Sequence, residues 1–393
     1  MDAKTSIEIH ENNVIYGCCP APAKKIVVAG GSGANQVTYS YDGSTWIISP
    51  TGNAIFGSLG TCEAVAYNGK IWVMGGNTST THNGVVRTLG YSFDGVFWYP
   101  SPSINLFGSN GAGTCFAVAS NGSMWVAGGS SVGLTPATYL AYSPDGISWT
   151  PIVTTVFSTT CNTVAWNGSI WVAGGDGTQP LAWSSDGITW TSANNPFVAT
   201  SCLSVYWNGQ SWLAGGNVSS GSVLATSTDG KTWTTIPNPS GVGTECHTIS
   251  SNGTQWLIGI AANSPPNYPV ILSSADGVHF TTTSASSLTH SGQCMSLLWT
   301  GTVWIAGGDD LSSKKILLSP DGLSWSITKN GDALFQNVTV GGSVEGSVRA
   351  LATNLLVPTT AKVHPKFSSY SEYYVWKRVN AQKYGNVVSP CAC

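Results

Sequence analysis

The chain repeats one short phrase seven times, Ser-x-Asp-Gly-x-x-Trp or a close variant. It reads S-Y-D-G-S-T-W from Ser40 and S-P-D-G-L-S-W from Ser319, while the copy from Ser273 to Phe280 ends in Phe and is one residue longer at its start. The aspartates of the seven copies are Asp42, Asp94, Asp145, Asp186, Asp229, Asp276 and Asp321, at steps of 52, 51, 41, 43, 47 and 45 residues. A period in the forties, with β-forming residues and tight turns, is typical of one propeller blade per repeat.

A second motif alternates with the first and completes the repeat. It consists of Asn-Gly, two residues and an apolar run that ends in Gly-Gly, as in N-G-K-I-W-V-M-G-G from Asn68 and N-G-S-I-W-V-A-G-G from Asn167. Asn-Gly and Asp-Gly both tolerate the positive φ angles of two-residue hairpin turns, so each repeat contains two hairpins. The sequence therefore predicts an all-β fold, a seven-bladed β-propeller with four antiparallel strands per blade.

The two ends of the predicted propeller complement each other. Blade one lacks a good first strand, because two prolines in C-C-P-A-P-A from Cys18 precede Ile26. The stretch S-V-R-A-L-A-T-N from Ser347 resembles the first strand of a blade, yet no second strand follows it. We expect this C-terminal strand to complete blade one beside residues 26–29 and to close the ring, which removes exposed strand edges.

The chain divides into an N-terminal arm (1–25), the propeller (26–357) and a C-terminal tail (358–393). The tail holds five of the fifteen basic residues together with four tyrosines and a tryptophan. It is either a strap packed on the propeller or a segment that docks on a partner.

The repeated Ser and Asp side chains can hydrogen-bond to backbone groups of their own turn, and the Trp can pack over the hairpin. A catalytic residue or a metal ligand is rarely needed seven times around a ring. We therefore assign the seven aspartates to turn stabilisation rather than to catalysis or metal binding.

The phrase resembles the Asp-box of the sialidase-type, or BNR, propellers, although it is one residue shorter between Asp and Trp. It is also similar to the D-G-x-x-W repeats of uncharacterised bacterial, phage and large DNA virus proteins. The resemblance covers about residues 26–357 and implies a propeller, but such propellers serve many purposes.

Sialidase chemistry, as the resemblance would imply, needs three arginines around a carboxylate, a Tyr nucleophile with a Glu partner and an acidic proton donor. The chain has only Arg87, Arg349 and Arg378, and the last lies in the tail. The arginine clamp is therefore absent, and we expect no enzymatic activity. The alternative is a glycoside hydrolase or lyase without that triad, which would require an acidic pocket at the centre of the ring.

The low content of charged residues limits the classes of partner that the protein can bind. Only 8% of the residues are charged, against about 25% in typical globular proteins, and Arg87 and Lys231 are the sole basic residues from Ile71 to Ser313. Nucleic-acid binding is excluded because phosphate neutralisation needs a cationic surface. A surface of Ser, Thr, Asn and Gly suits glycans or close contacts within an assembly.

No apolar run reaches transmembrane length, and the first ten residues lack the apolar stretch of a signal peptide. We expect that the protein does not insert into a membrane. We also expect that it is made in the cytoplasm, which is compatible with incorporation into a virus particle. The histidines show no metal-ligand spacing, and we expect neither a metal nor a cofactor.

Six of the ten cysteines occupy one position of the repeat, six residues before the Asn-Gly turn. They are Cys62, Cys115, Cys161, Cys202, Cys246 and Cys294. Small and bulky residues alternate after them, so we expect these thiols to be small buried side chains at the contacts between blades, not disulfides or metal ligands. The redox state of Cys18, Cys19, Cys391 and Cys393 stays open.

Both tight turns of a four-stranded blade fall on one face of the disk, and the variable connections fall on the other. Binding residues usually lie on such variable loops over a rigid scaffold. Four connections carry a phenylalanine shortly before the repeat cysteine: Phe56, Phe107, Phe157 and Phe197. These rings form either an aromatic platform for a sugar or protein, or anchors for their own loops.

The sequence thus predicts a non-catalytic binding or structural module, associated with a virus particle as a capsid or surface protein. Its expected partners are other virion or assembly proteins, reached through the tail (358–393), and a host glycan on the variable-loop face.

Overall fold

The computed structural model describes residues 25–57, 59–78, 87–108, 113–177, 179–194, 201–217, 222–238, 245–260, 271–287, 293–309, 315–335, 338–340 and 343–354. The predicted arm, apart from Lys25, and the predicted tail lie outside these residues, as do Cys18, Cys19, Cys391 and Cys393.

The described chain folds into seven four-stranded antiparallel sheets, which are the blades. Blade one contains β1 (Val27–Ser32), β2 (Val37–Ser40), β3 (Trp46–Ile48) and β30 (Ser347–Thr353). Blade two contains β4 (Thr61–Tyr67), β5 (Trp72–Asn77), β6 (Leu89–Ser92) and β7 (Tyr99–Pro100). Blade three contains β8 (Thr114–Ser120), β9 (Trp125–Ser130), β10 (Leu140–Ser143) and β11 (Thr150–Ile152). Blade four contains β12 (Cys161–Trp166), β13 (Trp171–Gly175), β14 (Leu181–Ser184) and β15 (Thr191–Ser192).

The remaining three blades repeat the pattern. Blade five contains β16 (Ser201–Trp207), β17 (Trp212–Asn217), β18 (Leu224–Ser227) and β19 (Thr234–Ile236). Blade six contains β20 (Cys246–Ser251), β21 (Trp256–Ile260), β22 (Ile271–Ser274) and β23 (Thr281–Thr282). Blade seven contains β24 (Gln293–Trp299), β25 (Trp304–Asp309), β26 (Ile316–Ser319) and β27 (Ser326–Ile327). The connections hold η1 (Gly52–Ala54), η2 (Ser284–Ser287), α1 (Gly331–Leu334) and a hairpin of β28 (Val338–Val340) and β29 (Ser343–Glu345).

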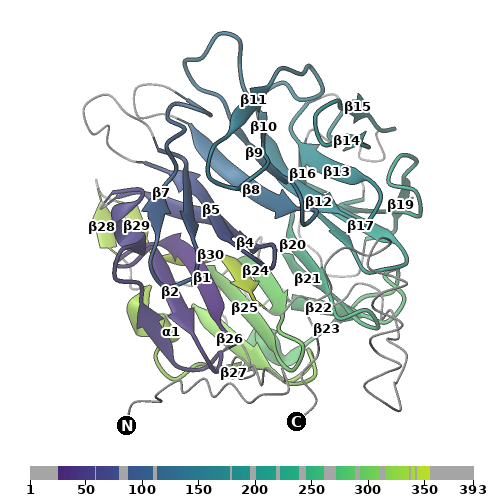
Figure 1. Ribbon diagram of the computed structural model, residues 1–393. Helices are drawn as coiled ribbons and strands as arrows, with labels where there is room; N and C mark the ends of the chain where they lie inside the picture. The colour runs from purple at the N-terminus through teal and green to yellow at the C-terminus, as the bar shows by residue number, and fades with distance from the viewer. Residues whose placement is uncertain are drawn as a thin grey trace, which may run out of the picture. The chain divides into compact units, whose positions relative to one another are not determined.

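The innermost strands contact one another in the order β30, β4, β8, β12, β16, β20, β24 and back to β30, so the blades form a closed ring (Figure 1). The predicted seven-bladed propeller is confirmed. We call the end of the ring with the Asn-Gly and Asp-Gly turns the turn face. The end with the connections from second to third strand and from blade to blade is the loop face.

The predicted closure of blade one is also confirmed. Strand β30 pairs antiparallel with β1, with Val27 opposite Thr353, and Figure 1 shows the two strands side by side. The backbone N–H of Asn354 donates to the carbonyl oxygen of Ile26 at 3.2 Å. The described chain therefore enters and leaves the propeller where the other blades have their Asn-Gly turn, at the turn face.

The turn motif forms a local hydrogen-bond network in each blade. Asp42 Oδ1 accepts the backbone N–H groups of Ser44 and Thr45, at 2.8 and 2.6 Å, and the hydroxyl of Ser40. Gly43 has φ +75°, a conformation that favours glycine. Burial alone would raise the pKa of Asp42, but the hydrogen bonds from Thr45 and Ser44 bring it to about 2.

The copy in blade six has the same spacing as the other six. The hydroxyl of Ser274, not that of Ser273, donates to Asp276 at 2.9 Å and accepts the N–H of Gly277. The apparent extra residue at the start of this copy is therefore part of the preceding strand.

Neighbouring blades interlock through glycine and cysteine. A Cβ built on Gly75 would lie 2.5 Å from Sγ of Cys115 in the next blade, so the thiol fills the space that the missing side chain leaves. The same contact recurs around the ring, with Val348 in place of cysteine beside Gly307. All six thiols are free and buried, and burial raises the pKa of Cys246 to about 12. The predicted small buried role of these cysteines is confirmed.

A second contact links neighbouring blades at their outer strands, at five of the seven seams. The side chain of Asn330, after blade seven, accepts the backbone N–H of Trp46 at 2.8 Å and donates to its carbonyl oxygen at 2.9 Å. Asn194 makes the same pair of bonds to Trp233 in the next blade. The bonds between Asn330 and Trp46 join blade seven to blade one, and they add to the closure that the pairing of β1 with β30 provides.

Candidate binding site at the loop-face end of the innermost strands

Each innermost strand carries a β-bulge at the same position. In blade two Cys62 lies opposite Gly76 and Ala64 opposite Gly75, so Glu63 between them has no partner in the ladder. The same register shift occurs in all seven innermost strands. A bulge frees one residue from the regular alternation of a strand and redirects its side chain.

A Gly-Gly pair makes room for the bulge at the end of the second strand in every blade except blade six, where Gly259 is followed by Ile260. The first glycine accommodates the cysteine of the next blade, as described above. A Cβ on the second glycine, Gly76, would collide with the carbonyl oxygen of Thr61, which the bulge brings close. The alternation of small and bulky residues that the sequence predicts after each cysteine is interrupted by the bulge at the first residue.

The predicted aromatic platform is wrong for the three phenylalanines that the structure describes. Phe56 and Phe107 are 0% exposed and Phe157 is 2% exposed. Phe56 packs beneath the second glycine of its own blade, where a Cβ on Gly76 would lie 2.9 Å from the ring. The rings anchor their own loops, because an apolar ring gains more from burial than from exposure. Phe197 lies outside the described residues.

The seven bulge residues differ in chemistry although their surroundings repeat. Each follows a buried cysteine or valine and precedes a small residue, and each is itself half-buried. In order around the ring they are Arg349, Glu63, Phe116, Asn162, Leu203, His247 and Met295. We call this set the bulge ring. It lies near the start of each innermost strand, toward the loop face.

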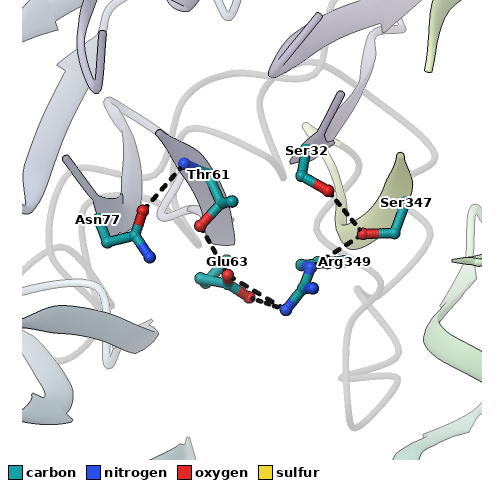
Figure 2. A network of polar contacts seen from close by, with 6 residues as sticks. All are labelled: Ser32, Thr61, Glu63, Asn77, Ser347 and Arg349. Carbon is teal, nitrogen blue, oxygen red and sulfur yellow. Dashed lines mark hydrogen bonds and ion pairs between the residues drawn. The ribbon is translucent and has the colours of Figure 1, made fainter. Parts of the chain in front are cut away.

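Arg349 and Glu63 are joined in a network that spans the seam between blades one and two (Figure 2). Nη1 of Arg349 donates to both carboxylate oxygens of Glu63 at 3.3 Å, and Nε donates to Oγ of Ser347 at 2.9 Å. The hydroxyl of Thr61 donates to Glu63 at 2.7 Å, while the hydroxyls of Ser32 and Ser347 lie 3.0 Å apart. Arg349 is thus held at two of its three nitrogens.

Asn162 is fixed in a similar way. Its amide nitrogen lies within hydrogen-bond distance of Asp176 Oδ1, at 3.0 Å, and of the carbonyl oxygen of Cys202, at 3.2 Å. Asp176 also accepts the hydroxyl of Ser201 across the seam. The side-chain oxygen of Asn162 accepts from no residue in the described ranges.

His247 and Glu245 form the third polar group. Nε2 of His247 lies 3.1 Å from Oε2 of Glu245, although the two atoms are poorly aligned for a hydrogen bond. The pKa of His247 is lowered, chiefly because the imidazole is buried. The negative charges of Glu245 and Asp309 oppose this shift, and the positive charge of Arg349 adds slightly to it.

Sequence reasoning missed the bulge ring, although the sequence contains a signal for it. The position after the repeat cysteine is Glu, Phe, Asn, Leu, His and Met in the six cysteine-bearing copies, whereas the next position is always Ala, Ser or Thr. The position that changes chemical class at every repeat is the bulge residue.

The seven turn aspartates lie at the opposite, turn face and contribute nothing to the bulge ring. No group of three possible metal ligands occurs within the described ranges. None of the helices described is long and apolar enough to cross a membrane.

No family model matches the sequence, and no curated protein matches it either. Solved structures do match. The structure of YCF48 bound to D1 peptide shares 13% sequence identity over 88% of this chain and 96% of that chain, with a TM-score of 0.51. A putative 6-phosphogluconolactonase from Bacteroides fragilis shares 8% identity over 85% and 99%, with a TM-score of 0.52. At these identities the likeness shows the fold alone, a β-propeller.

Proposed function

We propose that this protein is a non-catalytic binding module that recognises a partner through the bulge ring. One observation carries the proposal. A scaffold that repeats its Asp-Gly turn and its β-bulge in all seven blades, and its buried cysteine in six of them, carries a different residue type at the bulge of every blade. Repeat scaffolds hold their framework constant and vary the residues that meet the ligand.

The wider context that we propose is a structural component of an assembly such as a virus particle, with protein or glycan contacts. The described chain enters and leaves at the turn face, whereas the bulge ring lies toward the loop face. We propose that the protein attaches to other virion or assembly proteins through residues 358–393. Removal of residues 358–393 should reduce incorporation into particles, and undiminished incorporation would contradict this attachment.

A direct test uses two matched triple variants. Phe116→Ala, Leu203→Ala and Met295→Ala together truncate the three half-buried apolar residues of the bulge ring. Ile188→Ala, Val278→Ala and Leu323→Ala together truncate three exposed apolar residues that follow Asp-Gly on the turn face. Binders found on a glycan array or in a random peptide library should lose at least tenfold in affinity for the bulge-ring triple variant and keep it for the turn-face control.

A glycoside hydrolase or lyase is the second candidate, because carboxylates gather at this end of the ring. Glu63, Asp176 and Glu245 all belong to the networks described above. Each is already engaged by a neighbouring donor, Glu63 by Arg349, Asp176 by Asn162 and Glu245 by the amide of Asn217, which favours a structural use of these carboxylates. Hydrolysis of chromogenic glycosides by the wild type, lost in the Glu245→Gln variant, would contradict the non-catalytic proposal.

A further inference from the structure

We infer that the ligand of the bulge ring is an extended peptide segment without acidic side chains. The inference rests on the proposed function and narrows the class of partner. It combines three properties of the ring: the alternation of its side chains, its open hydrogen-bonding atoms and its charge.

Polar and apolar side chains alternate around most of the ring. After the Arg349–Glu63 pair, Phe116, Leu203 and Met295 occupy every second position, and Asn162 and His247 stand between them. An extended peptide also alternates apolar and polar groups along its length, because the polar N–H and C=O groups of its backbone lie between successive side chains. Leu and Met contact side chains of varied shape, and one aromatic ring gives little stacking surface for a sugar.

Two polar atoms of the ring have no hydrogen-bond partner among the described residues, and the neighbours of each side chain orient it. Arg349 donates from Nε and Nη1, while no residue in the described ranges accepts a hydrogen bond from Nη2. Asn162 uses its amide nitrogen, and no described residue donates a hydrogen bond to its side-chain oxygen. One fixed donor and one fixed acceptor match a carbonyl and an N–H of a peptide backbone, the groups through which extended peptides are commonly held.

The charge of this end of the ring disfavours an acidic ligand. Arg349 is neutralised by Glu63 at 3.3 Å. Asp176, Glu245 and Asp309 add negative charge, and burial lowers the pKa of the His247 imidazole. Like charges brought together at an interface reduce affinity, so the segment that binds should be neutral or basic.

The experiment is a selection of random twelve-residue peptides on the full-length protein, followed by affinity measurements with the labelled peptides. We expect the enriched peptides to lack Asp and Glu in their common segment. Replacement of a central residue of that segment by Asp should weaken binding at least tenfold at low salt, and the difference should shrink at high salt.

Two variants test the proposed contacts. Asn162→Ala removes the open acceptor, and the double variant Glu63→Gln, Arg349→Gln removes the donor without leaving an unpaired charge. Each should weaken binding of the selected peptides by tenfold or more, whereas the turn-face triple variant should bind as the wild type does.

The outcomes separate the inference from the proposed function. Acidic consensus peptides, no enriched peptide, or unchanged binding by both contact variants would overturn the peptide inference. Glycans bound by the wild type and lost in the bulge-ring triple variant would overturn it too, but would leave the proposed function standing. Ligands that bind the bulge-ring triple variant as tightly as the wild type would overturn both.

Discussion

Nη1 of Arg349 lies 3.3 Å from the carboxylate of Glu63, although 286 residues of chain separate them. The pair forms only when β30 has closed blade one beside blade two. It therefore connects the closure of the ring with the chemistry of the bulge ring: the strand that completes the fold also supplies one of the seven variable residues.

The first prediction concerns this pair. Glu63 is 10% exposed and Arg349 34% exposed, so removal of the guanidinium leaves a carboxylate with little solvent to compensate it. Arg349→Gln should lower the free energy of unfolding by about 2 kcal/mol, and Glu63→Gln by about 0.5–1 kcal/mol. The double variant should lose less than the sum of the two. Urea denaturation of the four proteins measures the coupling, and additive losses would mean that the pair does not interact.

The second prediction concerns the outer link between blades seven and one. Asn330→Ala leaves the N–H and the carbonyl oxygen of Trp46 without the partners that Asn330 supplies. The free energy of unfolding should fall by about 1–2 kcal/mol. Gln210→Ala, at an exposed position on an Asn-Gly turn, is the control and should cost little. Equal stability of the two variants would show that the link does not contribute.

The third prediction tests the glycine–cysteine contact. Gly75→Ala places a methyl group 2.5 Å from Cys115 Sγ and should destabilise the protein by about 1–3 kcal/mol. Cys115→Ala alone leaves a small cavity and should also destabilise it. The double variant should be more stable than the sum of the two changes predicts, because the new methyl group enters the space that the thiol vacates. If the double variant loses as much unfolding free energy as the two single variants together, or more, the proposed contact between glycine and cysteine is contradicted.

Much of this fold could be predicted from the sequence, because its determinants are local and repeated. Asp-Gly and Asn-Gly specify the turns, and the missing first strand before Ile26 identifies Ser347 as the start of the closing strand. The bulge could not be predicted in the same way. It depends on the carbonyl oxygen of Thr61 approaching Gly76 from a neighbouring strand, and a period-two pattern contains no information about that approach.

The candidate site was harder still to predict from the sequence. Phe107 and Phe157 suggested a platform because they recur in variable loops, but recurrence reflected their shared role as loop anchors. The bulge residues did not recur in type, and so the repeat pattern did not draw attention to them. In a repeat protein, what repeats specifies the framework, and the position that varies within it is the better guide to binding.

The fourth prediction concerns acid stability. Burial alone would raise the pKa of Asp186, but hydrogen bonds from the N–H groups of Thr189 and Ile188 bring it to about 2. Since an unfolded Asp has a pKa of about 3.9, the ionised carboxylate stabilises the fold fully above about pH 4, and this contribution is lost as the pH falls through 2. Asp186→Asn cannot titrate, so the urea midpoint of the variant should fall less between pH 4 and pH 2. Parallel curves for the two proteins would contradict this contribution.

The central claim is that the bulge ring, not the turn face, meets the partner. The most direct measurement compares the affinity of one selected binder for the wild type, for the bulge-ring triple variant and for the turn-face triple variant. We predict that the bulge-ring triple variant binds at least tenfold more weakly than the wild type and that the turn-face triple variant binds with unchanged affinity. Equal affinity for both variants, or a loss confined to the turn-face variant, would contradict the claim.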